Sequence, residues 1–518
     1  MSKELLSRIA RPSLHSKVMQ VGDTLKFFRD GQTLGMSGFT PAGYPKAIAV
    51  MLGEHVEQNN LQGKMRFRVL AGASTGAETL DNWARLDMLS DLYPYQTGKN
   101  IAKRINAGEL NFKDVHLSNY PNFLSYGYYG DIDIAIIEAT EILPDGSIVP
   151  GAASGIAQEV AHHAKQILIE VNTSMPSFKG LHDVVYDQNP PHRRPLMISR
   201  VDDRCGEPIV RLDPGKVIGI VESQLPDQGR TLPPPRQDEL KIAEHITEFM
   251  ESLVKRGTLP PNLLPLQSGV GGIANAVMVG FSKSKFQDLE LYTEVAQDNV
   301  LDLCDAGKLK FCSTAALSLS TGGFQRFYNE FDKYREKFLI RPQAITNHPE
   351  LIRRLGVISM NTPVEIDMYG HANSTHALGS KLLNGIGGSG DFFRNGFLSI
   401  VHTPSTRPSK SDPTGISCVV PFASHVDHTE HDILIYVTEQ GLADTRGLDP
   451  RKRARLIIEK CGHPDYKEQL LDYLQIAEKR HLASGSGHQP HLLEVAFQMH
   501  VNLQKHGTMK LKSWDVSA

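Results

Sequence analysis

The chain has 518 residues, of which 40% are hydrophobic and 22% charged, and its formal net charge is −3. This length exceeds what one hydrophobic core usually serves, so we expect a soluble globular protein of two domains. The charge argues against a dedicated nucleic-acid-binding protein, and no apolar run reaches the roughly 18 residues that a membrane span needs.

The N-terminal sequence and the cysteines indicate the compartment. "MSKELLSRIARPSLHSKVM" contains no apolar signal core, so we expect no export. The five cysteines are far apart in the chain and include no C-x-x-C pair, a pattern typical of free thiols in a reducing compartment. We therefore expect a cytoplasmic protein that has no membrane partner.

Strand-like and helical segments alternate along the first half of the chain. The segments 65–72, 131–140 and 165–172 are rich in β-branched residues and predict buried strands. This alternation predicts an α/β fold with mostly parallel sheets, in which ligands bind at the carboxyl ends of strands. A weak similarity in motif order between the two halves suggests two related domains.

A proline-rich segment, residues 223–239, separates the halves. Consecutive prolines favour an extended connector, because they fit neither helix nor central strand. A helix should follow, capped by Asp238 and ended by Gly257. We therefore expect an N-terminal domain at 1–222 and a C-terminal domain at 240–518.

In the second half, the segments 289–294, 418–423 and 432–439 predict further strands. Glu294 stands at the predicted end of the first, on a turn before a helix that Asp298 should cap. A free glutamate is an anion at neutral pH and can attack an activated acyl group without a general base. From position alone, a solvated turn residue is the simpler interpretation.

Two glycine loops, 269–274 and 385–390, match the dinucleotide-binding fingerprint. Neither follows a clear buried strand, which disfavours a nicotinamide site, and tight turns would also explain the glycines. A third interpretation is that the loops present backbone N–H groups to an oxyanion, such as the one formed when a carboxylate attacks a thioester. This last interpretation fits best with a reactive Glu294.

Other polar residues are less informative alone. His425, His428 and His431 have spacings that suit neither a helical nor a strand metal site, so we expect no metal. Asn347 and Glu439 flank elements of the second half and, taken alone, would be loop or cap residues.

Several motifs together resemble the acetyl-CoA hydrolase/transferase family. They are "LPLQSGVGGIAN", "YTEVAQD", "NGIGGSGDF", "HVDHTEHD" and "VTEQGLADTRG", with "MSGFTPAGYPK" and "GASTGAE" earlier in the chain. The resemblance is strongest to the bacterial succinyl-CoA:acetate CoA-transferases of the class I type. It implies two tandem class I CoA-transferase α/β domains, with the catalytic glutamate in the second, and a homodimer.

The resemblance also implies roles for individual residues. Glu294 matches the covalent glutamate, Asn347 a residue that positions the acyl group, and Glu439 a supporting carboxylate. Backbone N–H groups at Val270 and Gly388 match the oxyanion donors. Looser matches give an acid-binding role to Ser74 and CoA contacts to a wider set, namely Ser268, Gly269, Val270, Gly271, Asn384 and Gly388, with Arg407 or Lys410 as the basic contact. Gly272 stands where relatives often carry Asn, so a side-chain contact is not expected there.

The implied reaction is a ping-pong transfer of CoA from succinyl-CoA to acetate through a mixed anhydride and a glutamyl-CoA thioester. It requires no metal and no nicotinamide, and CoA enters only as a substrate. Three alternatives remain open: an acyl-CoA hydrolase on the same fold, a nicotinamide dehydrogenase and a non-catalytic CoA-binding regulator. The sequence does not distinguish acetate from propionate, butyrate or 4-hydroxybutyrate as the acceptor.

Overall fold

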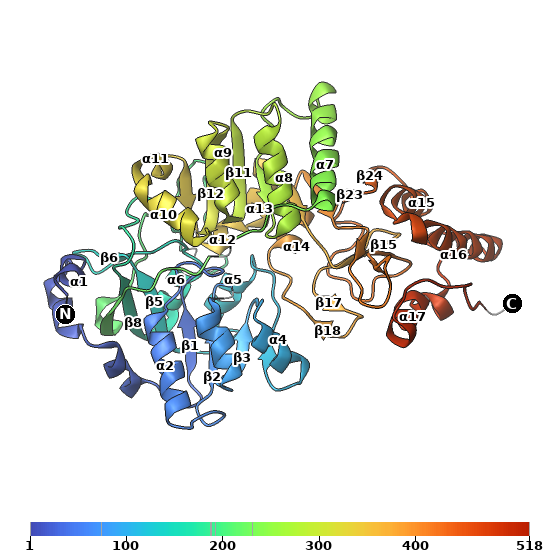
Figure 1. Cartoon of the computed structure of the whole chain (residues 1–518). Helices are drawn as coiled ribbons and strands as arrows, with labels where there is room; N and C mark the ends of the chain where they lie inside the picture. Colours follow the sequence, from blue (N-terminus) through green and yellow to red (C-terminus); the bar gives the residue numbers. More distant parts are fainter. Residues whose placement is uncertain (1, 74, 187–188, 192, 230, 517–518) are drawn as a thin grey trace. The chain divides into compact units, whose positions relative to one another are not determined.

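The computed structural model describes residues 2–73, 75–186, 189–191, 193–229 and 231–516 (Figure 1). Its internal contacts divide the chain into two compact units. The first unit comprises Met1–Thr231, Gln287–Leu355 and Asn384–Asp391, and the second comprises Leu232–Phe286, Gly356–Leu383 and Phe392–Ala518. Each unit is described separately below.

A seven-stranded sheet forms the N-terminal part of the first unit, in the order β4-β3-β2-β1-β5-β8-β9. All of its strand pairs are parallel. The strands are β1 (Thr33–Met36), β2 (Phe67–Leu70), β3 (Leu89–Tyr93), β4 (Asn111–Phe112), β5 (Ile132–Ala139), β8 (Ala164–Asn172) and β9 (Val217–Ser223).

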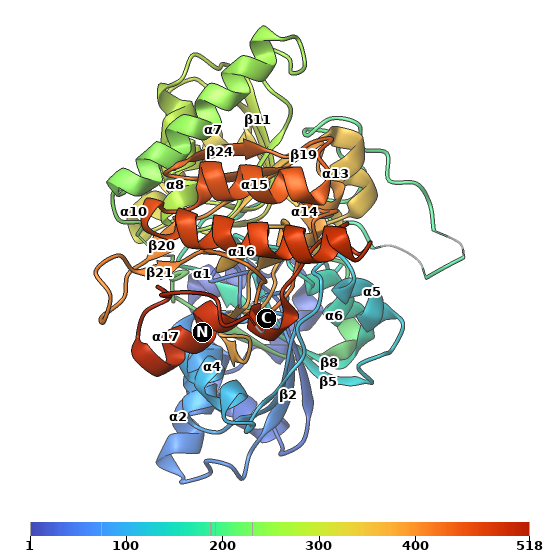
Figure 2. The same ribbon diagram turned by 90° about the vertical axis from the view of Figure 1, so that its right-hand side faces the viewer.

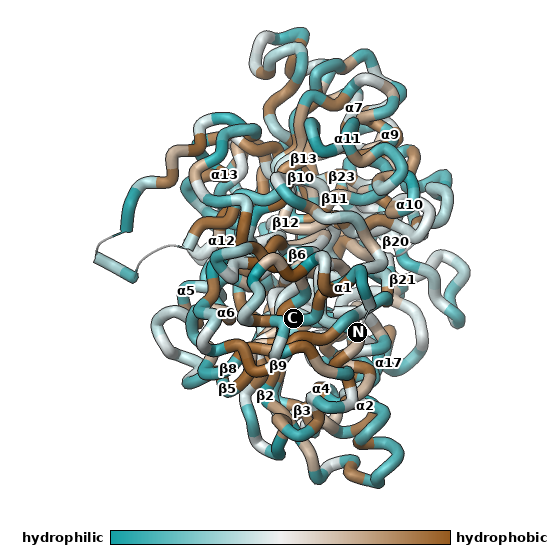
Figure 3. Tube along the Cα trace, turned by 90° about the vertical axis from the view of Figure 1, so that its left-hand side faces the viewer, coloured by the Kyte–Doolittle hydropathy of each residue, from teal (hydrophilic) through white to brown (hydrophobic). Residues whose placement is uncertain are grey.

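Both faces of this sheet are apolar, because helices cover each of them. Ile134 and Ile136 of β5 belong to a core shared with α2 (Ala47–Gln58), α3 (Asn82–Arg85) and α4 (Lys99–Asn106). Ala135 and Ile137 belong to the opposite core, with α5 (Tyr120–Ser125) and α6 (Ala157–His163). The hydrophobic colouring of β5, β8 and β9 in Figure 3 reflects this burial on two sides.

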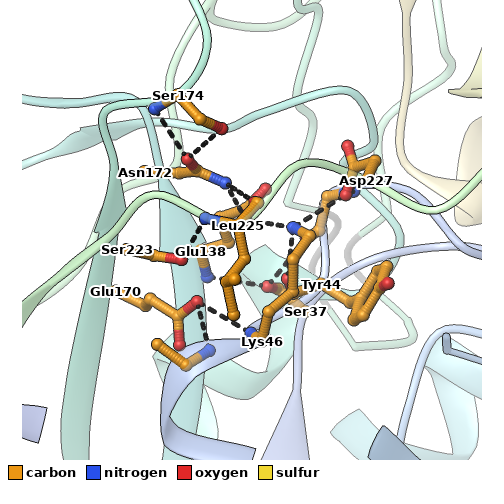
Figure 4. A network of polar contacts seen from close by, with 12 residues as sticks. Ser37, Tyr44, Lys46, Glu138, Glu170, Asn172, Ser174, Ser223, Leu225 and Asp227 are labelled. Carbon is orange, nitrogen blue, oxygen red and sulfur yellow. Dashed lines mark hydrogen bonds and ion pairs between the residues drawn. The ribbon is translucent and has the colours of Figure 1, made fainter. Parts of the chain in front are cut away.

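A buried polar network attaches the start of the proline-rich connector to this sheet (Figure 4). Lys46 pairs with Asp227 of the connector at 2.7 Å and also with Glu138 of β5. Asn172, the last residue of β8, donates to Glu138 at 3.0 Å and to the Leu225 carbonyl at 2.8 Å. The connector therefore begins as part of the N-terminal sheet layer.

The remainder of the first unit contains the parallel strands β11 (Leu289–Ala296), β12 (Leu309–Leu317) and β13 (Phe338–Ile340). Its helices are α9 (Asp298–Asp305), α10 (Thr321–Asn329), α11 (Phe331–Arg335), α12 (Gln343–Thr346) and α13 (Pro349–Leu355). Buried Arg341, which follows β13, pairs with Asp183 and donates to Ser313 of β12 at 2.7 Å. This pair joins the two parts of the first unit.

In the second unit, β10 (Leu266–Ser268), β14 (Ile358–Asn361), β19 (Leu398–His402) and β23 (Ile435–Thr438) are parallel, and β24 (Gly441–Asp444) is antiparallel. Helices α7 (Gln237–Lys255) and α8 (Gly272–Lys283) pack on each other. Figure 2 shows α15 (Pro450–Cys461) and α16 (Pro464–Ala483) side by side. Their core also includes α17 (Gln498–His506) and the small sheet β16-β15-β22.

The predicted α/β class with mostly parallel sheets is confirmed. Two local predictions are wrong. The helix after the connector begins at Gln237 with Arg236 as its N-cap, and Asp238 lies in its first turn. Of the predicted strand 418–423, only Val419–Val420 forms a strand, β22, which pairs in parallel with β15 (Glu365–Asp367).

Across the described residues, no helix combines the length and the apolar character that crossing a bilayer would require.

Candidate active site

Glu294 lies within β11, which continues two residues further to Ala296. Its neighbours Thr293 and Val295 are buried, and its own side chain is partly exposed. Its backbone carbonyl accepts a hydrogen bond from Thr314 Oγ1 at 3.0 Å. The expected turn position is therefore wrong: pairing with β12 holds Glu294 on the strand itself. The N-cap of α9 is Gln297, so the expectation that Asp298 caps this helix is wrong. The Asp298 carboxylate instead accepts a hydrogen bond from the Ser320 N–H at 2.8 Å.

Asn347, the C-cap of α12, contacts the Glu294 carboxylate directly. Its Nδ2 donates to Glu294 Oε1 at 2.8 Å and to Asp391 Oδ2 at 3.2 Å. The Asn347 side chain is fully buried, and its Oδ1 accepts from Thr346 Oγ1 at 3.1 Å. Both hydrogens of the amide therefore have carboxylate acceptors.

Gly388 packs its backbone against the same carboxylate, to which its N–H donates a hydrogen bond. A Cβ at position 388 would lie 2.1 Å from Glu294 Oε1 and 2.3 Å from Oε2. Real Cβ atoms do not approach other atoms so closely, so only glycine allows this contact. Three of the predicted site residues, Glu294, Asn347 and Gly388, are thus together in the first unit.

Sequence reasoning missed two residues of this cluster. Asp391, in the first turn of α14 (Ser389–Asn395), accepts from Asn347 and also from the Ser118 N–H at 3.0 Å and Ser118 Oγ at 2.5 Å. The motif "NGIGGSGDF" contains Asp391, but its partner Ser118 lies 273 residues away in the chain. No local pattern signals such a contact.

Burial raises the pKa of Glu294 to about 8. Hydrogen bonds from Asn347 and the Gly388 N–H oppose this rise, and the negative charge of Asp391 adds to it. Burial also raises the pKa of Asp391. Burial thus opposes the anionic form expected from the sequence at neutral pH, because a carboxylate that is largely removed from water retains its proton more readily.

The loop before Gly388 is held by the N-terminal part of the first unit. The Gly385 N–H donates to the Gln96 carbonyl at 3.2 Å, and the Ile386 N–H donates to Asp114 Oδ2 at 2.8 Å. Asn384 donates to the Gly385 carbonyl at 2.9 Å. The loop follows the two-residue strand β18 (Lys381–Leu382) and not a buried parallel strand. This context differs from that of a dinucleotide fingerprint.

The other glycine loop belongs to the second unit and lies between β10 and α8. The expectation that no buried strand precedes this loop is wrong, because Leu266 and Gln267 of β10 are buried and the strand pairs in parallel with β14. Ser268 ends β10, Gly269 follows it, and Gly271 adopts φ +112° directly before the helix. The Val270 side chain is 55% exposed. At Gly272 a Cβ would lie 2.2 Å from Glu239 Oε1, which explains glycine at this position.

The remaining predicted residues of the second unit differ in their availability to a ligand. Glu439 accepts from the Ser405 N–H at 2.8 Å and from Ser405 Oγ. Burial alone would raise its pKa, but these bonds leave it below the usual value. Arg407 donates to the Pro363 carbonyl at 2.7 Å and to the Val364 carbonyl at 3.2 Å, whereas Lys410 is exposed.

The three histidines of the second unit have different surroundings: His428 Nε2 lies 3.2 Å from Ser374 Oγ, and the His431 side chain is 82% exposed. His425 lies 3.2 Å from Asp427, whose carboxylate also accepts from the Ser374 N–H at 2.6 Å. In the part of the chain that the structure describes, no three His, Cys, Asp or Glu side chains are placed to hold a metal ion. Ser74, the predicted acid-binding residue, lies outside the described residues.

Solved structures share this fold. RipA from Yersinia pestis aligns with a TM-score of 0.70 over 90% of this chain and 98% of that chain, at 22% identity. The 4-hydroxybutyrate CoA-transferase from Porphyromonas gingivalis aligns with a TM-score of 0.61, also over 90% and 98%, at 18% identity. The fold is thus of the CoA-transferase type.

Sequence comparison identifies the family within this fold. Residues 4–222 match the acetyl-CoA hydrolase/transferase N-terminal domain, and residues 323–474 match the C-terminal domain. The acetyl-CoA hydrolase of Schizosaccharomyces pombe is 54% identical, covering 98% of this chain and 99% of its own length. That of Saccharomyces cerevisiae is 49% identical, covering 99% of both chains. The chain belongs to the acetyl-CoA hydrolase/transferase family and is an enzyme of that family, which confirms the predicted family.

Proposed function

We propose that this enzyme transfers CoA from succinyl-CoA to acetate through covalent intermediates on Glu294. The observation that carries the proposal is the environment of Glu294. Asn347 Nδ2 and the Gly388 N–H both donate to its carboxylate and fix its position. A positioned carboxylate with fixed donors suits nucleophilic attack on a thioester.

In the first half-reaction, a Glu294 carboxylate oxygen attacks the succinyl carbonyl carbon, the C–S bond breaks, and CoA departs as a thiolate. The thiolate then attacks the glutamyl carbonyl carbon of this anhydride. A C–S bond forms, the C–O bond to the glutamyl carbon breaks, and succinate leaves with the oxygen. The enzyme now carries a glutamyl-CoA thioester.

In the second half-reaction, an acetate oxygen attacks the glutamyl thioester carbon and expels the CoA thiolate. The thiolate attacks the acetyl carbonyl of the new anhydride, giving acetyl-CoA and the Glu294 carboxylate. Attack on the glutamyl carbon places negative charge on an oxygen of Glu294 itself. Asn347 Nδ2 and the Gly388 N–H, which already contact this carboxylate, are suited to stabilise that oxyanion.

We further propose that the Val270 N–H serves the oxyanion of the substrate carbonyl. Residues 268–271 and Asn384 would contact CoA. The basic contact would come from Lys410, because Arg407 already donates to backbone carbonyls and Lys410 is exposed. Glu439 would keep the Ser405 segment in place. No metal and no nicotinamide enters this reaction, since the thioester bond is conserved from donor to product.

A second candidate is hydrolysis of acetyl-CoA, favoured by the names of the fungal relatives, about half of whose residues are identical. Hydrolysis needs a base that activates water beside the acylated glutamate. Asp391 shares the Asn347 amide with Glu294, and its oxygens accept from Ser118 and Asn347. Because both Asp391 oxygens already accept hydrogen bonds, this carboxylate is poorly placed to act as the base that activates water, which favours transfer over hydrolysis.

Mass spectrometry after incubation with succinyl-CoA tests the covalent role. The peptide containing Glu294 should gain the mass of CoA less water, and E294Q should lose both the adduct and the transfer activity. The matched control is E290Q, on the same strand but paired with Lys310 at 2.8 Å, which should retain both. Transfer activity in E294Q, or an adduct on another residue, would contradict the proposal.

A further inference from the structure

Two carboxylates share the amide of Asn347. Glu294 Oε1 and Asp391 Oδ2 accept from the same Nδ2, at 2.8 and 3.2 Å. Since Nδ2 carries only two hydrogens, this arrangement uses both and fixes which end of the amide faces Glu294. Removing Asp391 would remove one of the two contacts that set this orientation.

Asp391 is itself immobilised away from the reacting atoms. Ser118 donates to both of its oxygens, through the backbone N–H at 3.0 Å and through Oγ at 2.5 Å. Asp391 is 5% exposed, so its carboxylate has little contact with solvent or substrate. Its effect on Glu294 must therefore pass through Asn347 and through its charge.

We propose that Asp391 is a positioning residue that orients Asn347 and, by its negative charge, disfavours the free Glu294 carboxylate relative to its acylated forms. This inference rests on the function proposed above. A Glu294 anion beside Asp391 places two like charges near each other in a poorly solvated site. In the anhydride and in the thioester the glutamyl carboxyl group itself carries no charge, so acylation relieves that repulsion.

The direction of the pKa of Glu294 agrees with this geometry, since the charge of Asp391 adds to the effect of burial. Among the described residues, the titratable groups recorded beside Asp391 include Glu294, from β11, and His116, from the segment before α5. His116 Nδ1 lies 3.9 Å from Asp391 Oδ1, and a proton on its ring would offset the charge of Asp391. The test therefore includes an H116Q background.

The experiment measures kcat/KM for CoA transfer against pH in the wild type and in D391N, each with and without H116Q. In the wild type, kcat/KM should rise with pH to a midpoint near 8, because Glu294 must be ionised to attack. In D391N the midpoint should fall by about one pH unit or more, and kcat/KM above the midpoint should fall about tenfold. A purely structural role for Asp391 would not shift the midpoint.

E159Q is the matched control. Glu159 is a buried carboxyl on α6 whose pKa burial raises to about 7, so it titrates in a similar range. Its substitution should leave the midpoint unchanged. An equal shift in E159Q would contradict the assignment of the midpoint to Glu294 and Asp391. If D391N does not fold, D391S replaces it, because serine also lacks the charge.

The two proposals fail in different ways. Absence of a CoA adduct on Glu294 in the wild type contradicts the proposed function and this inference with it. An adduct in the wild type together with an unshifted midpoint in folded D391N or D391S contradicts only the role of Asp391.

Discussion

At the residue scale, substitution of Gly388 is expected to have one of the largest effects on the rate of CoA transfer. The backbone of Gly388 lies against the Glu294 carboxylate, where a Cβ would be 2.1 Å from Oε1. In G388A the carboxylate must move, and a displacement of about 1 Å at a reacting group costs roughly 100-fold in rate. We expect kcat for CoA transfer to fall at least about that far, while the thermal unfolding midpoint changes little.

The control for G388A is G322A, on α10, where the nearest atom to a new Cβ is Ser320 Oγ at 3.8 Å. This variant should keep its activity. Wild-type rates in G388A would show that the carboxylate does not need the position seen in the structure.

The sequence predicted some of these residues and not others for physical reasons. Glu294, Asn347 and Gly388 belong to motifs that the family resemblance carries. Asp391 and Ser118 form a contact across 273 residues of chain, which only the folded structure brings about. The raised pKa of Glu294 could not be predicted from the sequence either, because it depends on burial and on the charge of Asp391.

At the scale of elements, the strongest strands were predicted well because they are buried on both faces. The prediction 165–172 corresponds to β8 at Ala164–Asn172, and 131–140 to β5 at Ile132–Ala139. The prediction 289–294 ended β11 too early, since pairing of Val295 and Ala296 with β12 extends the strand. Short strands of the small sheet, such as β22, form because they pair with strands distant in the sequence, and the residue pattern of the strand itself does not reveal that pairing.

The Lys46 network attaches the connector to the N-terminal sheet, and its removal should destabilise that sheet. K46M would leave Glu138 and Asp227 without their buried cation, which typically costs about 3–5 kcal/mol. The control K165M removes an exposed pair with Asp133 at the start of β5 and should cost about 1 kcal/mol or less.

Amide hydrogen exchange of β5 and β8 measures this effect locally, which avoids assuming that the whole chain unfolds in one step. The triple variant K46M/E138Q/D227N should recover part of the lost protection, because it leaves no buried charge unpaired. Equal exchange in K46M and K165M would contradict the role of the network.

At the scale of the whole molecule, the chain does not divide at a single point. Contacts group residues 287–355 with the N-terminal 231 residues, so the unit containing Glu294 is built from segments far apart in the chain. The linear boundaries predicted at 222 and 239 remain a prediction. The composition along the chain reveals the proline-rich connector. It does not reveal that residues 287–355, which come after the connector, pack with the N-terminal residues.

The central claim concerns the whole reaction, which should pass one oxygen atom from acetate to succinate through Glu294. When acetate attacks the glutamyl thioester, one of its oxygens remains on Glu294 after acetyl-CoA leaves. In the next turnover that oxygen departs with succinate. A hydrolase would instead take the new oxygen from water.

The most direct measurement therefore follows heavy oxygen from labelled acetate during many turnovers in ordinary water. Mass spectrometry should find the label in the released succinate and in the peptide that contains Glu294. Labelled succinate with a Glu294 peptide that never gains label would contradict the covalent route. Succinate labelled only from heavy water, and not from acetate, would contradict CoA transfer itself.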